Sequence, residues 1–349
     1  MDESKGLELG MVFDNPLFHT VYGRNLISSL PETVAPPYLV VTLPELWHLA
    51  KTQLEGPQLS HLHFVESLEL DDLNRLVDEL PRSASVIGIG GGKALDVAKF
   101  IAWRRNLPLF QVPTIMSVDA PFGHRSAVRI KGVVRYVGWA VPQVVYVDYD
   151  IIKNAPQRLN RAGVGDVFCY HTSLYDWKLA SERGKTGYWP YDVDVASQMQ
   201  DILDRVRRKT KEIHDVTEEG IKILAEALRW GGAAYHNAGW NARVEGSEHF
   251  FFYTLEYLTQ KGFVHGEAVS LGILFMSALQ GNDPEGISRS IHETGVAIKP
   301  EDLNITWDDA VRAFKQTKSF SEKNNLFYSV VNEKDASDKI IEDVKSRLQ

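Results

Sequence analysis

The sequence predicts an α/β domain followed by an all-helical domain, and three observations support this fold class. Before residue 155, short β-branched runs alternate with helical patterns, as in a mostly parallel sheet with both faces covered. After Pro156, long stretches carry apolar residues at three- and four-residue spacing, which is typical of amphipathic helices. The 349 residues are 44% hydrophobic, enough for two cores. We therefore predict domains at residues 1–155 and 156–349.

The elements of the first domain follow from residue pattern and from the residues that bound them. Apolar runs bounded by glycine, proline or aspartate predict strands at Leu39–Thr42, Ser85–Ile89, Leu107–Val112 and Val144–Val147. Helical patterns cover Leu70–Leu80 and Lys93–Arg104. The segment Val128–Gly138 alternates without a helix, which predicts an antiparallel hairpin.

The second domain is predicted to be helical throughout its patterned stretches. These stretches are Asp166–Ala180, Val193–His214, Thr217–Tyr235, Glu248–Gln260 and Ala268–Leu279.

Composition and charge argue against several classes of protein. Lys and Arg number 38 against 46 for Asp and Glu, a net charge of −8 that argues against a nucleic-acid partner. No run approaches the length of apolar chain that spans a membrane. The N-terminus shows no secretory pattern, and the single cysteine, Cys169, fits a reducing compartment. We therefore expect a cytoplasmic protein.

A glycine-rich turn joins one predicted strand to the helix that follows it. Gly90, Gly91 and Gly92 separate the apolar strand from Lys93 and the helical pattern. Glycines let backbone N–H groups approach a phosphate closely, and a helix N-terminus adds favourable partial charge. The P-loop and the dinucleotide fingerprint are both incomplete, since Ala94 and Lys93 stand where they need a hydroxyl and a glycine. A plain turn remains the alternative, but it needs fewer glycines, so we predict phosphate or pyrophosphate binding.

Polar residues also follow the next predicted strand. Thr114, Ser117 and Asp119 come after its carboxyl end, where parallel sheets bind their ligands. The alternative is a polar turn in which Asp119 caps local backbone N–H groups.

Three residues of the helical half are candidate metal ligands: Asp166, His249 and His265. Two neutral imidazoles and a carboxylate fill three positions on a divalent ion and leave one open for a substrate oxygen. Each residue also has a plainer explanation, as a helix N-cap, a core histidine and a turn residue respectively. Tyr253 and Glu256 share a helix face with His249 and could lie near the ion.

Taken in order along the chain, these motifs resemble the superfamily of metal-dependent polyol dehydrogenases and dehydroquinate synthase. The resemblance extends over residues 85–272, about half the chain. It is carried by Gly90-Gly91-Gly92-x3-Asp96-x2-Lys99, Pro113-Thr114-x2-Ser117-x-Asp119, Gly165-Asp166, Glu248-His249 and His265-Gly266-Glu267. Within the superfamily, three further segments are similar to sn-glycerol-1-phosphate dehydrogenases: Lys153–Pro156, Ala162–Asp166 and Thr172–Leu179.

The resemblance implies a dehydroquinate synthase-like fold, with a Rossmann-like nucleotide-binding domain, a helical domain and a homodimeric assembly. It implies that Asp166, His249 and His265 hold one divalent metal, which we expect to be Zn²⁺, with Fe²⁺ or Ni²⁺ as alternatives. It places cofactor contacts on Gly90, Gly91, Gly92, Lys93, Asp96, Thr114 and Ser117, and it places Asp119 near the substrate or the nicotinamide.

The implied activity is that of an NAD- or NADP-linked oxidoreductase that interconverts a glycerol-1-phosphate-like polyol, phosphorylated or not, and its ketone. The ion would act as a Lewis acid on the substrate oxygen, Asp119 would orient a hydroxyl, and Arg125 or Arg243 would bind an anionic group. The chain departs from the glycerol-1-phosphate branch at Gly123 and over residues 240–246, so other polyols and sugar alcohols stay in the substrate class.

The cofactor preference has one indication in the sequence. Enzymes that prefer NAD often place an acidic residue after the second strand, to bind the ribose 2′-hydroxyl. Here Leu39–Thr42 is followed by no acid before Glu45. We therefore expect NADP(H) to be tolerated or preferred.

Two other functions remain open at this stage. One is a dehydroquinate synthase-like cyclase that uses NAD transiently, although that branch usually has Glu at the position of Asp166 and His at that of Tyr253. The other is a catalytically silent relative that only binds nucleotide or metal.

Overall fold

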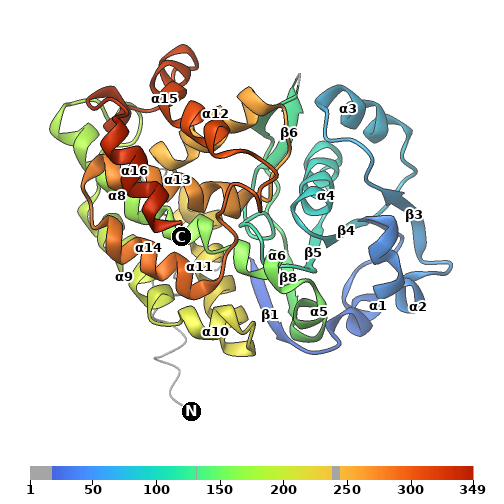
Figure 1. Ribbon diagram of the computed structural model, residues 1–349. Coiled ribbons are helices and arrows are strands. Elements are labelled where there is room, and N and C mark those ends of the chain that lie inside the picture. Colours follow the sequence, from blue (N-terminus) through green and yellow to red (C-terminus); the bar gives the residue numbers. More distant parts are fainter. Residues whose placement is uncertain (1–17, 131, 238–243, 349) are drawn as a thin grey trace. The chain divides into compact units, whose positions relative to one another are not determined.

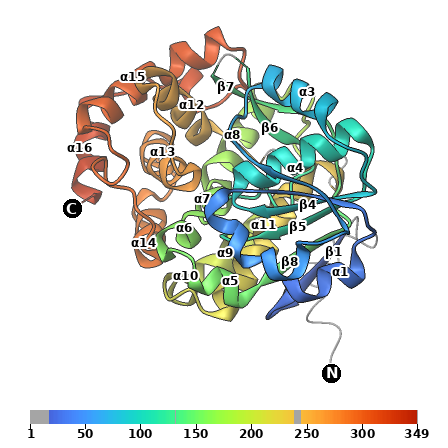
Figure 2. The ribbon, with the colours of Figure 1, turned by 90° about the vertical axis from the view of Figure 1, so that its right-hand side faces the viewer.

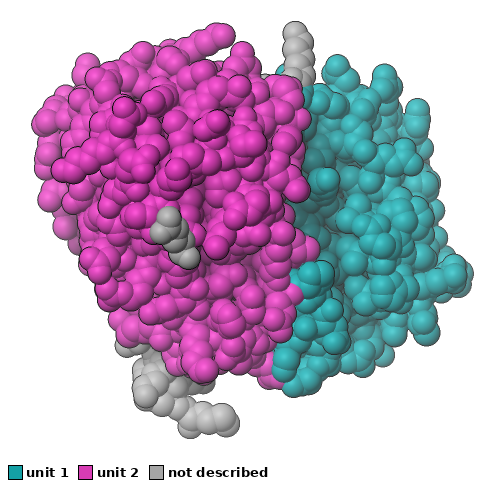
Figure 3. Space-filling view, viewed as in Figure 1, with its two compact units in different colours: residues 1–156 teal, residues 157–349 magenta. Residues whose placement is uncertain are grey.

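The computed structural model describes residues 18–130, 132–237 and 244–348. The chain forms two compact units, residues 1–156 and 157–349 (Figure 3). Each unit has its own secondary structure and its own buried interior, and the two are described in turn.

The first unit is built on a six-stranded parallel sheet with the order β1-β8-β5-β4-β2-β3 (Figure 1). Its strands are β1 (His19–Gly23), β2 (Tyr38–Thr42), β3 (Leu59–Phe64), β4 (Ser85–Gly90), β5 (Leu109–Pro113) and β8 (Val144–Asp148). Apart from β1, this is the flavodoxin-like order, which reverses direction between β2 and β4. In such sheets ligands bind outside the carboxyl ends of the strands at the reversal, which here lies beside the glycine-rich turn.

Helices cover both faces of this sheet. The helical elements of the unit are η1 (Leu26–Ser29), α1 (Leu30–Thr33), η2 (Pro44–Leu49), α2 (Lys51–Leu54), α3 (Leu70–Glu79), α4 (Gly92–Arg105) and α5 (Tyr149–Asn154). On one face, Leu30 and Leu54 pack with Val40 and Ile87 of the sheet. On the other face, side chains of α3 and α4 pack in a second cluster against β2, β4 and β5. The buried sheet explains the continuous apolar runs in its central strands.

The predicted α/β fold class is confirmed, and so are the four predicted strands, which are β2, β4, β5 and β8. The predicted hairpin consists of β6 (Ser126–Ile130) and β7 (Val133–Val137), which pair antiparallel. Sequence analysis missed β1 and β3 because both are partly exposed strands at the edges of the sheet. His61 and His63 interrupt the apolar pattern of β3.

The second unit is helical in its described residues. Its elements are α6 (Gln157–Ala162), α7 (Gly165–Phe168), α8 (Tyr170–Glu182), α9 (Val193–Arg207), α10 (Thr210–His214), α11 (Glu218–Asn237), α12 (Ser247–Thr259), α13 (His265–Gln280), α14 (Pro284–Thr294), α15 (Trp307–Lys323), η3 (Val330–Asn332) and α16 (Asp338–Arg347). Helix α13 lies at the centre of the unit, where it contacts α7, α8, α12, α14 and α16 (Figure 2). Nearly all of its residues are buried, which explains its mostly apolar sequence.

The structure refines the helical predictions in two places. The predicted helix Asp166–Ala180 is two helices, α7 and α8, that meet at Cys169, and Val193–His214 is likewise divided into α9 and α10. Helices α14, α15 and α16 lie beyond the predicted stretches. Among the described residues, no helix is both long and apolar enough to cross a membrane.

Candidate functional site

Three candidate ligands come together within the second unit. Asp166 lies in the first turn of α7, His249 in the first turn of α12, and His265 is the first residue of α13. One potential ligand atom from each residue lies within 4.8 Å of the corresponding atoms of the other two. The Nε2 atom of His265 is 3.0 Å from Oδ1 of Asp166, and the two imidazole rings are 5.3 Å apart. Residues separated by up to a hundred positions thus form one cluster.

Glycines make this convergence sterically possible. A Cβ atom on Gly266 would stand 1.7 Å from the carbonyl oxygen of Ala162, and one on Gly165 would stand 2.4 Å from the carbonyl oxygen of Gly266. The start of α13 therefore lies directly against α6 and α7, with no room for any side chain. The dipeptides Gly165-Asp166 and His265-Gly266 pair a candidate ligand with the glycine that allows its helix to approach closely.

An ion pair between a buried carboxylate and a half-exposed arginine anchors the same end of α13. Glu267 is 1% exposed, and its two oxygens accept hydrogen bonds from Nε and Nη2 of Arg158, at 2.6 and 2.7 Å. Arg158 also donates to the carbonyl oxygen of Asp302 at 2.6 Å. This two-pronged contact raises the pKa of the Arg158 guanidinium. It joins the helix that begins with His265 to α6.

His249 is oriented by its neighbour along the chain. Its Nδ1 atom lies 2.8 Å from Oε1 of Glu248, and both side chains are almost completely buried. Because a carboxylate only accepts, Nδ1 is the donor and Nε2 is left to face a ligand. Burial lowers the pKa of His249, but the carboxylates of Glu245, Glu248 and Asp166 outweigh it and raise the value to about 9. A metal ion at Nε2 would replace a proton there.

The donor set of Asp166, His249 and His265 fits a divalent transition metal. Two imidazoles and one carboxylate suit Zn²⁺, Fe²⁺ or Ni²⁺, and three protein ligands leave a position for substrate. A second cluster, Cys169, Glu248 and His249, also has its ligand atoms within 4.8 Å. It fits a metal less well, because both Glu248 oxygens already accept hydrogen bonds and the Cys169 thiol donates to Val244.

The structure also shows what surrounds His249 on its helix. The hydroxyl of Tyr253 donates to Oε2 of Glu245 at 2.9 Å, and the Tyr253 ring is 6.2 Å from that of His249. Tyr253 was expected near the ligands, whereas Glu245 was not singled out. Glu245 lies only four residues before His249, which could have indicated that the two side chains are close. Because Glu245 precedes helix α12, helical spacing does not predict this contact.

In the first unit, the predicted nucleotide contacts lie on two adjacent turns and on the start of α4. Gly90 pairs with Pro113 across β4 and β5, and the amide of Thr114 donates to the carbonyl oxygen of Gly90 at 3.0 Å. Gly90 has φ +151°, which disfavours other residues. Helix α4 starts at Gly92 without a side-chain cap on its first turn. A Cβ on Gly91 would lie 2.9 Å from Ile115, so the two turns touch.

The remaining residues of these turns differ in exposure. Lys93 is exposed, Thr114 and Ser117 are buried, and Asp119 is half-buried. The carbonyl oxygen of Asp119 accepts from the amides of Phe122 and Gly123, which forms a tight turn.

Asp96 has a structural partner that the sequence did not predict. Its carboxylate lies 2.8 Å from Nζ of Lys99, which is 1% exposed and donates to the carbonyl oxygen of Arg125 at 2.8 Å. Burial raises the pKa of Asp96, against the opposing effect of the Lys99 ammonium. The pair ties α4 to the segment that leads into the hairpin. A cofactor contact by Asp96 stays a prediction.

Of the two candidate anion-binding arginines, Arg125 donates from its guanidinium to the carbonyl oxygen of Tyr136 in the hairpin. Arg243 lies outside the described residues, as does most of the divergent segment 240–246.

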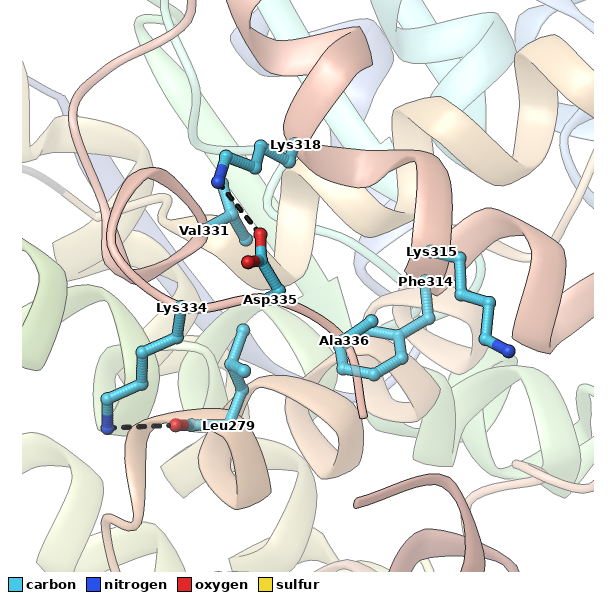
Figure 4. A pocket seen from close by; sticks show the side chains of 8 residues that line it. All are labelled: Leu279, Phe314, Lys315, Lys318, Val331, Lys334, Asp335 and Ala336. Carbon is cyan, nitrogen blue, oxygen red and sulfur yellow. Dashed lines mark hydrogen bonds and ion pairs between the residues drawn. The ribbon is translucent and has the colours of Figure 1, made fainter. Parts of the chain in front are cut away.

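A cavity of about 150 Å³ in the second unit lies apart from these residues (Figure 4). Lysines at its rim are paired: Lys318 with Asp335 at 2.8 Å, and Lys334 with the carbonyl oxygen of Leu279 at 3.1 Å. None of the predicted site residues lines this cavity.

Comparison with known proteins identifies relatives of the chain. Residues 48–156 match the iron-containing alcohol dehydrogenase family. The chain is 31% identical to glycerol-1-phosphate dehydrogenase, NAD(P)+, of Saccharolobus solfataricus over 80% of this chain and 81% of that protein. It is 28% identical to the protein of the same name from Metallosphaera sedula over 83% and 85% of the two chains.

Solved structures share the fold. A probable glycerol dehydrogenase from Sinorhizobium meliloti matches with a TM-score of 0.73 at 20% identity, over 95% of this chain and 96% of the other. Glycerol dehydrogenase from Schizosaccharomyces pombe matches with a TM-score of 0.68 at 18% identity, over 95% and 90%. The chain therefore belongs to the iron-containing alcohol dehydrogenase superfamily, in the branch of the glycerol-1-phosphate dehydrogenases.

Proposed function

We propose that this protein is a metal-dependent, NAD(P)-linked dehydrogenase that interconverts a polyol phosphate of the glycerol-1-phosphate class and its ketone. The convergence of Asp166, His249 and His265 supports this proposal, because the cluster they form could hold a transition metal, whereas the sequence shows only scattered residues. The relatives named glycerol-1-phosphate dehydrogenase support the substrate class and the cofactor.

The second unit would provide the metal centre. Asp166 and the two histidines would hold the ion, and a divalent ion bound there supplies Lewis acidity toward a substrate hydroxyl or carbonyl oxygen. The His249 side chain is buried, and its Nδ1 atom is hydrogen-bonded to Glu248. This hydrogen bond holds the ring in one orientation and keeps water from Nδ1. Zn²⁺ is our proposal for the ion, with Fe²⁺ or Ni²⁺ as alternatives, since the donor set accepts all three.

The first unit would bind the dinucleotide. Gly90, Gly91 and Gly92 with the start of α4 form the proposed pyrophosphate site, because an uncapped helix N-terminus presents backbone donors to an anion. Lys93, Asp96, Thr114 and Ser117 are proposed contacts on and around the same two turns. Their position beside the strand-order reversal of the sheet supports this assignment.

One carboxylate and two arginines are proposed to orient the substrate. We assign Asp119 to a substrate hydroxyl, because a half-buried carboxylate at the carboxyl end of a strand can accept a hydrogen bond from it. Arg125 and Arg243 remain candidates for the phosphate group of the substrate.

The test combines metal analysis with redox assays on the purified protein. We expect the purified protein to contain a stoichiometric transition metal. When a phosphorylated ketotriose is added, we expect oxidation of NAD(P)H, measured as a fall in its absorbance. Asp166→Ala and His265→Ala should lose both metal and turnover. Phosphate release without net NAD(P)H change would favour the cyclase instead, and tight binding of metal and nucleotide without turnover would favour a silent relative.

Assembly and location are further parts of the proposal. We propose a cytoplasmic homodimer, which sedimentation analysis of the purified protein and cell fractionation would test. A monomer in solution would contradict the first part, and recovery outside the cytoplasmic fraction would contradict the second.

A further inference from the structure

Helix α8 contributes none of the three proposed ligands, yet it holds the helix that carries His249. The hydroxyl of Thr172, on α8, donates to Oε2 of Glu248 at 2.6 Å. The other oxygen of Glu248 accepts from the amide of Gly246 at 2.6 Å and from Nδ1 of His249 at 2.8 Å. Thr172 and Glu248 are both 0% exposed. Both oxygens of Glu248 are therefore engaged, one by the ligand and one by α8.

A second contact reinforces the first. Asp176, one turn further along α8, accepts from the amide of Ser247 with Oδ2 and from the amide of Val330 with Oδ1, both at 2.8 Å. Gly246, which precedes α12, packs closely against α8, because a Cβ atom on Gly246 would lie only 2.8 Å from Cα of Ser173. The first turn of α12 thus has one position relative to α8.

We propose that Thr172 and Glu248 are positioning residues for the metal centre, a proposal that rests on the metal site of the proposed function. Glu248 selects the tautomer and ring orientation of His249, and Thr172 fixes the carboxylate so that it cannot rotate away from the ring. A carboxylate hydrogen-bonded to a ligand histidine raises the basicity of the imidazole toward a metal. The geometry of His249 is therefore set by a hydroxyl on a different helix.

If the hydrogen bonds among Thr172, Glu248 and His249 served only to stabilise the fold, the variants would behave differently. If Glu248 only satisfied the free amides at the start of α12, loss of the Thr172 hydroxyl would lower stability and leave metal affinity unchanged. Metal affinity and stability therefore have to be measured separately, on variants that change one contact each.

The sharpest variant is Thr172→Val, which keeps the volume and removes the hydroxyl, beside Thr172→Ser, which keeps the hydroxyl. Thr254→Val is the matched control: Thr254 is 1% exposed, lies on the same helix as His249, and donates only to the carbonyl oxygen of Phe250. Co²⁺ alone is the probe, with affinity from competition with a chelator, geometry from the visible spectrum, and thermal unfolding recorded on the metal-free proteins.

We expect Thr172→Val to bind Co²⁺ about 10- to 100-fold more weakly, with an altered spectrum. Thr172→Ser should restore affinity to within about threefold of the wild type, and Thr254→Val should bind as the wild type does even where its stability falls. Wild-type affinity and spectrum in Thr172→Val would overturn the proposal. Failure of the wild-type protein itself to bind Co²⁺ would instead remove the metal centre of the proposed function.

Glu248→Gln keeps the proposal testable if Thr172→Val does not fold. The amide oxygen of glutamine can accept from His249 and Gly246, while its NH₂ group donates to Thr172, whose hydroxyl turns to the carbonyl oxygen of Cys169, 3.1 Å away. The fold is then retained without the negative charge. We expect at least about tenfold weaker Co²⁺ binding, and unchanged binding would contradict the role of Glu248.

Discussion

The close approach of α13 to α6 makes Gly266→Ala a decisive substitution. The added methyl group would stand 1.7 Å from the carbonyl oxygen of Ala162, about half an ordinary van der Waals separation. Backbone rather than a flexible side chain is in the way, so the two helices must separate by roughly 1.5 Å. His265, the preceding residue, would move with α13.

Two measurable losses follow from that displacement. Overpacking of this kind costs about 3 kcal/mol or more when backbone has to move. A ligand shifted by more than about 0.5 Å no longer has productive geometry, so we expect the affinity for Zn²⁺ to fall at least about 100-fold. Urea denaturation measures the first loss, and chelator competition measures the second.

A neighbouring glycine provides the control. A Cβ on Gly262 meets nothing within 4 Å, so Gly262→Ala should leave metal affinity unchanged and alter stability by less than about 1 kcal/mol. If Gly266→Ala retained wild-type metal affinity and unfolding free energy, the steric account of the site would be refuted.

Three further predictions follow. Burial raises the pKa of Asp176 to about 6, so the native state holds a proton that the unfolded chain has lost, and stability should fall as pH rises from about 4 to 6. Asparagine does not titrate, so the unfolding free energy of Asp176→Asn, relative to that of the wild type, should rise by about 3 kcal/mol between about pH 4 and 7 in urea denaturation. A difference between the two proteins that does not change with pH would contradict this. Arg158→Ala removes the partner of the buried Glu267 carboxylate and should lower the free energy of unfolding by about 1–2 kcal/mol in urea denaturation, because solvent screens the half-exposed arginine. Arg158→Ala/Glu267→Gln should recover part of that loss, and no recovery would contradict this account. Steady-state rates should show that NADP(H) is accepted at least as well as NAD(H), and a roughly hundredfold preference for NAD(H) would exclude the idea.

Much of the fold follows from local pattern. The central strands are apolar throughout because helices cover both faces of the sheet, and that pattern survives in the sequence without knowledge of the partners. The edge strands β1 and β3 lack this burial, so their sequences resemble loops. The division of α7 from α8 at Cys169 could not be predicted, because the helical periodicity continues across it.

The sequence identified the candidate site residues but did not decide between their possible roles. Asp166, His249 and His265 were candidates by residue type and by resemblance, but each also had an ordinary explanation within its own segment. Only their arrangement separates these alternatives: Asp166 does not cap α7, which has Val164 at its N-cap, and His265 begins a helix. Asp96 shows the converse, because its buried partner Lys99 gives it a structural task beside the predicted one.

The sequence by itself determined the class of each half of the chain and the chemical character of its conspicuous motifs, because strand and helix periodicity and glycine-rich turns are local properties. Tertiary structure decided which motifs act together. The distances among the proposed ligands depend on helices that meet only because Gly165 and Gly266 lack side chains, and on a hydroxyl of α8 that lies far from His249 in sequence. Such contacts arise from packing between distant segments, and no local pattern encodes them.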